Sequence, residues 1–360
     1  MRSLQAFCVS EKVSGGELYI LELLAAMERL GWSCSIVTGN NTALMKRATE
    51  YGIRSSQIRL GPKLGKKTFF RTICTWPIQL VRLRRHLKRS EFPIVLMQYK
   101  LEQLLSAFLP PKGVTVILEH GPVPDLITRI PPVRMLYVRA LRRADLVLAA
   151  SGPAKTSLRT LGVDSRLLLA GNDPRRVMSA TDLRTEHRSV LEDYVGAGIL
   201  GVYAGRIVAN KGVFDAVRLV SGLSGVGLVL FGDGPDADLL RERVADLPNV
   251  FYAGPVPDPL PYIAAADFGI LLTRDPGEGR PLFGIECLSV GTPLVAVGGS
   301  AAIDGLVAEF GPDNVRLIDP TSSAGLASSI RKTHARNFYD RSWDDAAADF
   351  KRYIASIERQ

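Results

Sequence analysis

The chain has 360 residues, of which 46% are hydrophobic and 22% are charged, and its formal net charge is +9. This composition is that of an ordinary globular protein, and the length favours two domains over one. No apolar run approaches the roughly 18 to 20 residues that a membrane-spanning helix needs. Residues 1–7 become polar too soon for a signal peptide, so we predict a cytoplasmic protein.

The cysteines give no sign of a metal site. Cys8, Cys34, Cys74 and Cys287 are widely separated and form no CxxC pair. Zinc sites and disulfide frameworks use closely or regularly spaced cysteines. We therefore expect four reduced cysteines that serve packing, and no bound metal.

The first half of the chain alternates short apolar runs with amphipathic stretches, a pattern typical of alternating strands and helices. We expect strands at 4–9, 33–38, 94–98, 114–119 and 146–150, and helices at 16–30, 77–89 and 133–143.

The second half repeats this rhythm. We expect strands at 198–203, 227–231, 250–253, 268–272 and 293–297, and helices at 212–219, 236–245, 259–264, 285–290 and 343–357. Residues 171–193 are polar and without periodicity, which indicates a linker. The alternation predicts an α/β fold of two doubly wound, Rossmann-like domains, residues 1–180 and 181–340, that face each other across a cleft.

A basic segment lies at residues 63–89, with aromatic side chains among the charges. It contains Lys63, Lys66, Lys67, Arg71, Arg82, Arg84, Arg85, Lys88 and Arg89, together with Phe69, Phe70 and Trp76. A solvated helix face explains such a run. A surface that contacts anionic lipid or an anionic acceptor explains it equally well. Nucleic acid is not expected, because no nucleic-acid motif accompanies the charge.

Two glycines, Gly15 and Gly16, stand between the first strand and the first helix. Paired glycines allow a ligand to approach the backbone closely, and a helix start offers free N–H groups that suit a phosphate. A tight turn explains the pair equally well. The GxGxxG pattern is absent, which disfavours a nicotinamide cofactor.

A second candidate site follows the strand that opens the second half. Gly205 and Arg206 end this strand, and Lys211 immediately precedes a helix. Two cations beside a helix start can bind a diphosphate, since arginine binds bidentately and lysine acts as a point charge. A solvated loop is the alternative.

Further polar residues stand at other strand ends. A lone histidine usually has a structural role, but His120 follows a strand directly and precedes a glycine, which favours a ligand contact. Asp233 lies in an Asp-Gly-Pro turn, so we expect it to shape a pocket rather than to react.

Two carboxylates, Glu278 and Glu286, are separated by seven residues. The first lies in a Gly/Pro-rich loop, and the second is expected where a helix begins. Carboxylates accept strong hydrogen bonds from vicinal hydroxyls. The pair can therefore bind two ends of one polyhydroxyl ligand, such as a sugar and a ribose.

The order of these motifs resembles that of GT-B glycosyltransferases of the family 4 type, over most of the chain. The matching motifs are the glycine loop at Gly15-Gly16, the strand-end histidine in Glu119-His120-Gly121, the strand 144–151 ending in serine, the phosphate clamp Gly205-Arg206 with Lys211-Gly212, the E-x7-E motif of Glu278 and Glu286 followed by Gly291-Thr292-Pro293, and Ser342-Trp343 before the last helix. The resemblance implies a GT-B architecture in which residues 341–360 pack back on the first domain.

The resemblance also implies a function and residue roles. The activity would be retaining transfer of a sugar from a nucleotide-diphosphate sugar, most commonly a UDP-sugar, to a hydroxyl acceptor, without a metal or other cofactor. Residues with implied catalytic roles are His120, Arg206, Lys211 and Glu278. Residues with implied donor-binding roles are Gly15, Gly16, Gly205, Asp233, Gly279, Arg280, Pro281, Leu282 and Glu286.

One position departs from the family pattern, which commonly has Phe-Gly where this chain has Arg280-Pro281. Proline removes a backbone donor, and arginine adds a charge that we expect near the sugar. We therefore hypothesise an altered, anionic donor sugar. Two other functions stay open, a sugar-nucleotide 2-epimerase and a non-catalytic sugar-nucleotide-binding partner. The acceptor stays open between a glycan, a lipid-linked molecule and a small metabolite.

Overall fold

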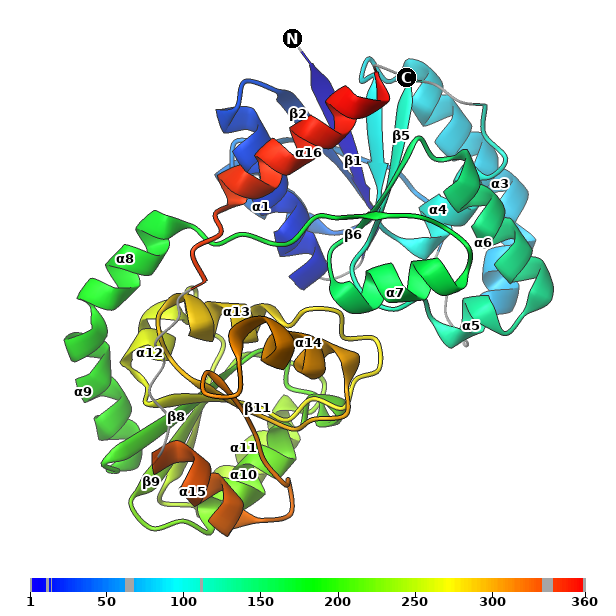
Figure 1. Ribbon diagram of the computed structural model, residues 1–360. Helices are drawn as coiled ribbons and strands as arrows, with labels where there is room; N and C mark the ends of the chain where they lie inside the picture. Colours follow the sequence, from blue (N-terminus) through cyan, green and yellow to red (C-terminus); the bar gives the residue numbers. More distant parts are fainter. Residues whose placement is uncertain are drawn as a thin grey trace. The chain divides into compact units, whose positions relative to one another are not determined.

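The computed structural model describes residues 2–10, 13, 15–61, 68–110, 113–331 and 339–358. The chain forms two compact units (Figure 1), which we call unit 1 (Met1–Gly171 with Ser342–Gln360) and unit 2 (Asn172–Arg341). The division between them falls after residue 171, compared with the expected position after residue 180.

Unit 1 contains a parallel sheet with the described strand order β3-β2-β1-β4-β5-β6-β7. Its strands are β1 (Ser3–Cys8), β2 (Ser33–Thr38), β3 (Arg54–Gln57), β4 (Ile94–Met97), β5 (Val114–Glu119), β6 (Leu146–Ala149) and β7 (Arg166–Leu167). Its helices are α1 (Gly15–Arg29), α2 (Thr42–Glu50), α3 (Phe69–Arg89), α4 (Lys100–Ser106), α5 (Asp125–Thr128), α6 (Pro131–Arg143), α7 (Gly152–Thr160) and α16 (Trp343–Ile357).

Unit 2 contains a second parallel sheet, with the described order β10-β9-β8-β11-β12-β13. Its strands are β8 (Ile199–Ala204), β9 (Val226–Phe231), β10 (Val250–Gly254), β11 (Phe268–Leu271), β12 (Leu294–Ala296) and β13 (Val315–Leu317). Its helices are α8 (Pro174–Asp182), α9 (Arg184–Val195), the 3-10 turn η1 (Ala209–Lys211), α10 (Val213–Ser221), α11 (Ala237–Val244), α12 (Leu260–Ala265), α13 (Leu282–Ser289), α14 (Ala301–Phe310) and α15 (Ser323–Arg331).

The predicted α/β class with two doubly wound sheets is confirmed. Every expected strand is found within one or two residues of its predicted bounds. Buried parallel strands read as continuous apolar runs, and β4 and β9 are buried along their whole length. The sequence did not indicate β3, which is polar and lies at a sheet edge, or the short strands β7 and β13, which are two and three residues long.

The prediction that residues 171–193 form a linker is wrong, because α8 and α9 occupy most of this segment. Asp173 caps α8, since its Oδ1 accepts from the Arg175 N–H at 2.9 Å, and Pro174 stands at the first helical position. Ala180 and Leu191 are buried against α12 in the unit 2 core. Only a few apolar residues face that core, so the sequence showed no clear period.

The prediction that a helix begins at residue 77 is also wrong, since α3 begins at Phe69 and Pro77 lies inside it. A proline inside a helix removes one hydrogen bond but does not prevent packing on both sides. Leu80, Leu83 and Leu87 contact the core of unit 1. The lysines of the basic segment at 63, 66 and 67 lie outside the described residues.

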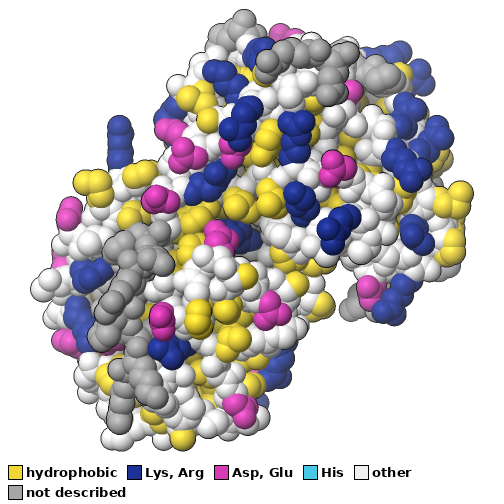
Figure 2. All heavy atoms as spheres, viewed as in Figure 1, with side chains coloured by type: hydrophobic (Ala, Val, Ile, Leu, Met, Phe, Trp, Pro, Cys, Tyr) yellow, Lys and Arg dark blue, Asp and Glu magenta, His cyan; other side chains and the backbone are white. Residues whose placement is uncertain are grey.

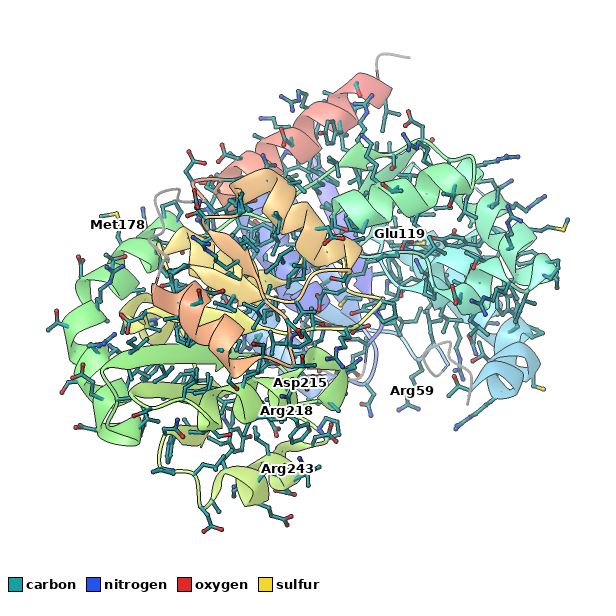
Figure 3. All side chains as sticks on the ribbon, turned by 60° about the horizontal axis from the view of Figure 1, so that its bottom comes forward. Arg59, Glu119, Met178, Asp215, Arg218 and Arg243 are labelled. Atoms are coloured by element: carbon teal, nitrogen blue, oxygen red, sulfur yellow. The ribbon has the colours of Figure 1, made fainter. Side chains whose placement is uncertain are left out.

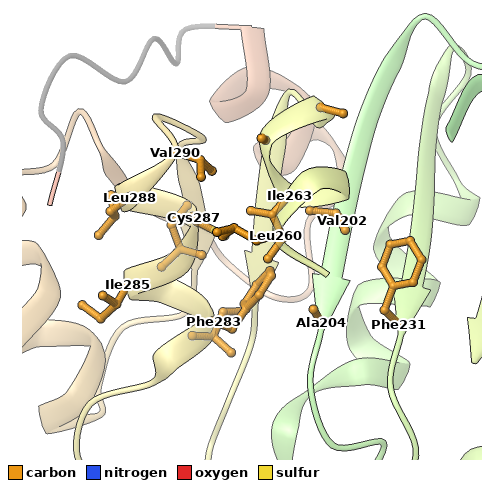
Figure 4. Packing of buried hydrophobic residues seen from close by; sticks show 14 of the residues in the cluster. Val202, Ala204, Phe231, Leu260, Ile263, Phe283, Ile285, Cys287, Leu288 and Val290 are labelled. Atoms are coloured by element: carbon orange, nitrogen blue, oxygen red, sulfur yellow. The ribbon is translucent and has the colours of Figure 1, made fainter. Parts of the chain in front are cut away.

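The order of the strands places a switch point in each sheet, between β1 and β4 in unit 1 and between β8 and β11 in unit 2. From these pairs the chain continues in opposite directions along the sheet, so the loops at the carboxyl ends diverge and leave room for a ligand. Beside the switch point in unit 2, α12 and α13 pack on β8 and β9 through a dense apolar cluster (Figure 4). This cluster fixes the loops that follow the strands.

Unit 1 is completed by α16, which packs on α1. Trp343 meets Tyr19 edge to face with ring centroids 5.1 Å apart, and Phe350 is fully buried near Trp32. The chain passes between the units at two neighbouring points, since the Asn172 N–H donates to the Arg341 carbonyl at 2.8 Å.

Candidate functional site

The loop after β8 is held against the end of β11 in unit 2. Gly212 has a φ of +75°, and an added Cβ there would overlap the Leu272 carbonyl, so only glycine fits. The Arg274 N–H donates to the Asn210 carbonyl at 2.9 Å. These contacts bring Lys211 to the loop that follows β11, at the switch point of the sheet.

Lys211 meets two carboxylates in this position. Its Nζ forms ion pairs with Glu278 and with Oδ2 of Asp275, the latter at 3.3 Å. The three side chains are 17–28% exposed, so their charges remain accessible to a ligand. The structure thus brings together Lys211 and Glu278, which the sequence had singled out, and adds Asp275, which it had not.

The turn that presents Glu278 is built by Asp275. The Asp275 Oδ1 accepts from the Gly277 N–H at 2.9 Å, and its carbonyl accepts from the Glu278 N–H at 3.1 Å. Below this turn, the Tyr203 hydroxyl donates to the Arg206 carbonyl at 3.0 Å. Burial, and secondly the Glu278 carboxylate, raise the pKa of Tyr203, so the phenol stays protonated and acts as a donor.

The side chain of Arg206 is exposed to solvent just after β8. Gly205 lies beside Gly232, whose φ is +130° and whose position admits no Cβ because the Gly205 carbonyl is in contact. The Asp233 carboxylate accepts from the Gly234 N–H at 2.7 Å. Asp233 therefore shapes the loop after β9; its predicted role in a ligand pocket stays a prediction.

Asp215 ties α10 to the loop after β11. It forms an ion pair with Arg274 at 3.2 Å and also accepts from Arg218 at 3.2 Å on the same helix (Figure 3). The helix that follows Lys211 is thus attached to the loop that carries Asp275 and Glu278, which supports the cluster from its outer side.

Glu286 is the fifth residue of α13, so the expectation that it stands where a helix begins is wrong. The helix starts earlier because Pro281 caps it with extended backbone, a position where the missing N–H costs nothing. The Glu286 Oε1 lies 3.4 Å from Nη2 of Arg176, which also binds Asp258 at 2.6 and 3.0 Å. Arg176 belongs to α8, the segment expected to be a linker.

Arg280 does not present its charge as expected. It binds Glu309 through two hydrogen bonds of 2.5 and 2.9 Å, and its side chain is only 10% exposed. The guanidinium also lies over the rings of Tyr339 and Phe310, at 5.2 and 5.9 Å. Its charge is thus neutralised inside unit 2, and the pair attaches the Glu278 loop to α14. Beside it, Gly279 is buried and Leu282 opens α13.

In unit 1, three loops at the carboxyl ends of β1, β4 and β5 converge. An added Cβ at Gly16 would lie 3.5 Å from the Tyr99 hydroxyl and 3.7 Å from the His120 ring. Glu17 is buried and accepts a hydrogen bond from the Tyr99 hydroxyl. Gly15 is the first residue of α1, so the start of this helix lies in the same cluster.

His120 is held from several sides. Its Nε2 lies 2.7 Å from Oε1 of Gln98, its carbonyl accepts from Ser151 at 2.9 Å, and Tyr19 meets its ring edge to face. Burial lowers the pKa of His120 to about 4, against a smaller opposing effect of Glu17, so the imidazole is neutral at pH 7. A neutral imidazole can donate with one nitrogen and accept with the other.

Glu119, next to His120, serves the core rather than a ligand. It lies inside unit 1 (Figure 3), in an ion pair with Lys100 and with a 2.5 Å hydrogen bond from the Tyr137 hydroxyl. Burial lowers the pKa of Lys100, and the Glu119 carboxylate opposes that change. The network fixes the end of β5 and hence the position of His120.

Within the described part of the chain, no group of three His, Cys, Asp or Glu side chains could bind a metal ion. The described helices are each too short or too polar to span a bilayer.

The fold and the two polar clusters define a class of protein, since both sheets are parallel and both clusters lie at a switch point. Sucrose-phosphate synthase from Thermosynechococcus elongatus has this fold, with a TM-score of 0.75, 17% identity and complete coverage of both chains. HepE from Anabaena, solved with UDP and glucose, gives a TM-score of 0.68 and 17% identity over 100% of this chain and 98% of its own. The chain has the GT-B fold.

Family models then identify the family. The glycosyltransferase family 4 model matches residues 13–172, and the glycosyl transferases group 1 model matches residues 199–335. The chain belongs to this family of transferase enzymes, as the sequence motifs predicted. A UDP-GlcNAc 2-epimerase from Neisseria meningitidis shares the fold more distantly, with a TM-score of 0.63 and 13% identity over 99% of this chain and 100% of its own.

Two relatives are similar in sequence. TuaC of Bacillus subtilis, named as a teichuronic acid biosynthesis glycosyltransferase, is 29% identical over 219 residues, which is 59% of this chain and 52% of TuaC. LpsE of Rhizobium meliloti, a lipopolysaccharide core biosynthesis glycosyltransferase, is 25% identical over 283 residues, 76% of this chain and 74% of LpsE. The match thus spans about half the length of TuaC.

Proposed function

We propose that this protein is a retaining glycosyltransferase that moves a sugar from a nucleotide-diphosphate sugar to a hydroxyl acceptor. The observation that carries the proposal is the meeting of Lys211 and Glu278 at the switch point of unit 2. One side chain suits a diphosphate and the other suits sugar hydroxyls, and both remain partly exposed. The family and the UDP complex of HepE support a UDP-sugar as the donor.

In this proposal, donor binding exchanges the partners of Lys211. A diphosphate carries more charge than a carboxylate and therefore competes with Asp275 and Glu278 for the ammonium group. Once it is bound, the Glu278 carboxylate is available to accept hydrogen bonds from sugar hydroxyls. Arg206, exposed at the end of β8, adds a second positive charge for the leaving diphosphate.

Glu286 is proposed to bind the ribose hydroxyls. Its carboxylate is 28% exposed and forms an ion pair with the guanidinium of Arg176 at 3.4 Å. An ionised carboxylate has only acceptors, so it can bind two neighbouring hydroxyls at once. Arg176 thereby becomes a supporting residue that links α8 to the proposed ribose site.

Unit 1 is proposed to supply neutral contacts. The backbone N–H groups at the start of α1, where Gly15 and Gly16 stand, suit a phosphate. The neutral imidazole of His120 suits a sugar hydroxyl. With no nucleophile in this set, catalysis rests on positioning and on neutralising the charge of the leaving diphosphate, and needs no cofactor.

The first experiment is thermal unfolding of the full chain with UDP, GDP, ADP and NAD, and with their sugar conjugates where these exist. A ligand at about a hundred times its Kd adds roughly 2.7 kcal/mol to the free energy of unfolding. This raises the midpoint of thermal unfolding by a few degrees. One nucleotide diphosphate should give this shift, and Glu286→Ala should abolish it. Absence of a shift with every nucleotide contradicts the proposal.

The shared fold favours a 2-epimerase as the second candidate. Incubating a UDP-sugar without acceptor separates the two activities, because an epimerase forms the epimer and a transferase does not. Nucleotide-sugar binding without turnover on a broad acceptor panel indicates the non-catalytic partner instead.

For the acceptor side, we propose peripheral contact of α3 with an anionic membrane. Basic side chains line the exposed part of this helix, and Ile78 and Val81 are 55% and 46% exposed among them. Apolar and basic residues on one helix face favour the surface of anionic lipid. Flotation with anionic vesicles, and with uncharged vesicles as the control, tests this. Absence of binding to the anionic vesicles at low salt overturns the proposal.

A further inference from the structure

Unit 1 has a second basic surface, separate from α3, in the form of a groove along α6. The groove has a volume of about 750 Å³. The arginines that line it are Arg129, Arg134, Arg139, Arg142 and Arg143. Figure 2 shows lysine and arginine side chains gathered over the side of unit 1 that carries α3 and α6. We call this surface the arginine groove.

The helical period explains why these side chains share one surface. Arg134 and Arg142 are eight residues apart, about two turns or 12 Å along α6. Val138 stands midway between them and also lines the groove. The result is a stripe in which cations alternate with apolar side chains, rather than the uniformly polar face of a solvated helix.

The positive charges in the arginine groove are largely uncompensated. No carboxylate lines it, and among the described residues only Arg129 has an acidic partner, Asp125, at 2.8 Å. Arg139 and Arg143 instead donate to backbone carbonyls, those of Ala107 at 3.3 Å and Leu109 at 2.9 Å. The carbonyls hold these two guanidinium groups without cancelling their net charge, so both remain cations in the lining of the groove.

The helix dipole accounts for only part of this pattern. Cations stabilise the last turn of a helix, which explains Arg142 and Arg143. Arg134 stands near the start of α6, where a cation is unfavourable and no acidic residue compensates it. The helix dipole therefore does not explain the position of Arg134.

The lining also contains apolar groups that a purely anionic ligand does not need. Met135 is 73% exposed, and Val138 and Leu161 lie beside it. An exposed methionine is a flexible apolar surface suited to chains of variable shape. Guanidinium groups bind phosphate bidentately. We propose that the arginine groove binds a phosphate or diphosphate group that is attached to an apolar chain.

The proposal is independent of the proposed sugar transfer, because none of the groove residues belongs to unit 2 or to the His120 cluster. Its test uses the full chain and titration calorimetry with geranyl diphosphate as the probe, at low and at high salt. The test variant is Arg134→Glu/Arg142→Glu, in which neither side chain makes a described hydrogen bond. The matched control is Lys46→Glu/Arg47→Glu on α2, which changes the net charge equally.

We expect the Kd for geranyl diphosphate to rise about tenfold or more in the groove variant, since each cation near a phosphate contributes a few-fold. The control should change it less than about twofold after correction for salt screening. UDP binding should be equal in both variants. Equal weakening in the two variants, or no binding by the wild type, overturns the proposal.

Two further arms separate the sources of phosphate. Inorganic pyrophosphate that binds as tightly as geranyl diphosphate removes the apolar part of the proposal and overturns it. Vesicles of phosphatidylglycerol that bind while geranyl diphosphate does not indicate a membrane surface and also overturn it. Should the glutamate variant unfold, Arg134→Gln/Arg142→Gln removes the same charges without adding new ones, and a threefold or larger rise in Kd supports the site.

Discussion

The two polar clusters of the molecule differ in their chemistry although both lie at a switch point between parallel strands. The unit 2 cluster is ionic and partly exposed, with Lys211 between Asp275 and Glu278. The unit 1 cluster is also partly exposed, but it holds a neutral histidine between Gln98 and Tyr19. Ionic groups that can change partners suit a ligand with a charged leaving group. Neutral groups in fixed positions suit the orientation of hydroxyls.

The largest effect is expected at the ionic cluster. Replacement of Lys211 with alanine removes the cation proposed to stabilise the leaving diphosphate, and loss of one such group costs about a hundredfold in kcat. Turnover of the nucleotide sugar with its acceptor measures this. Lys46→Ala, an exposed lysine on α2, is the control. A Lys211→Ala rate within threefold of the wild type would reject the assignment.

Glu286→Ala comes next. One hydrogen bond to a charged group is worth about 1.5–3 kcal/mol, or roughly tenfold to a hundredfold in kcat/KM. The effect should fall mainly on KM for the donor, because ribose contacts are made in the ground state as well. Glu286→Gln keeps the size and should retain part of the binding. An unchanged KM in both variants is the contrary result.

The stability contributed by the His120 cluster should depend on pH. The folded pKa of His120, about 4, lies below the ordinary 6.5, so only the unfolded chain binds a proton between these values. The contribution of His120 to the free energy of unfolding is fully present above about pH 6.5. It falls by about 2–3 kcal/mol as the pH is lowered toward 4. Urea unfolding of the wild type and His120→Gln across this range measures the difference.

The comparison with His120→Gln is necessary because a neighbouring acid titrates oppositely. Burial raises the pKa of Glu102 to about 7, so its contribution is lost as pH rises from 4.5 to 7. The two effects partly cancel in the wild type. A stability difference between wild type and His120→Gln that does not vary with pH would show that His120 is accessible to protons in the folded protein.

The smallest effect is expected at Arg280. Arg280→Ala leaves Glu309 without its partner, and we expect a loss of about 1–3 kcal/mol in unfolding free energy, moderated because Glu309 is partly exposed. The preference between neutral and acidic sugar nucleotides should not change, since the charge is neutralised within unit 2. A selective loss of the acidic donor would restore the hypothesis that Arg280 contacts the sugar.

The sequence indicated the fold well because buried parallel strands appear in it as continuous apolar runs. It also indicated Lys211 and Glu278, because each follows a predicted strand and strand ends meet at one sheet edge. It did not indicate Arg176, whose partner Glu286 is 110 positions away in the chain. Pairings of this kind depend on how α8 packs on α12, and no local pattern records that packing.

The sequence also did not indicate whether a charged side chain is exposed or buried. Arg280 was expected beside the sugar because a motif placed it there, whereas the structure buries it against Glu309 and Tyr339. Gln98 and Tyr99 follow β4 directly, so their position at a strand end was the available signal for the His120 cluster.

The way α16 completes unit 1 has a consequence for biosynthesis. Unit 2 is one continuous segment, Asn172–Arg341, so the ribosome releases all of it before the residues of α16 emerge. Until then, the surface of α1 that later packs against α16, including Tyr19 against Trp343, lacks this partner. The half of the protein that is translated first is therefore the last to be finished, and a nascent chain stalled before residue 342 exposes an apolar helix face to chaperones.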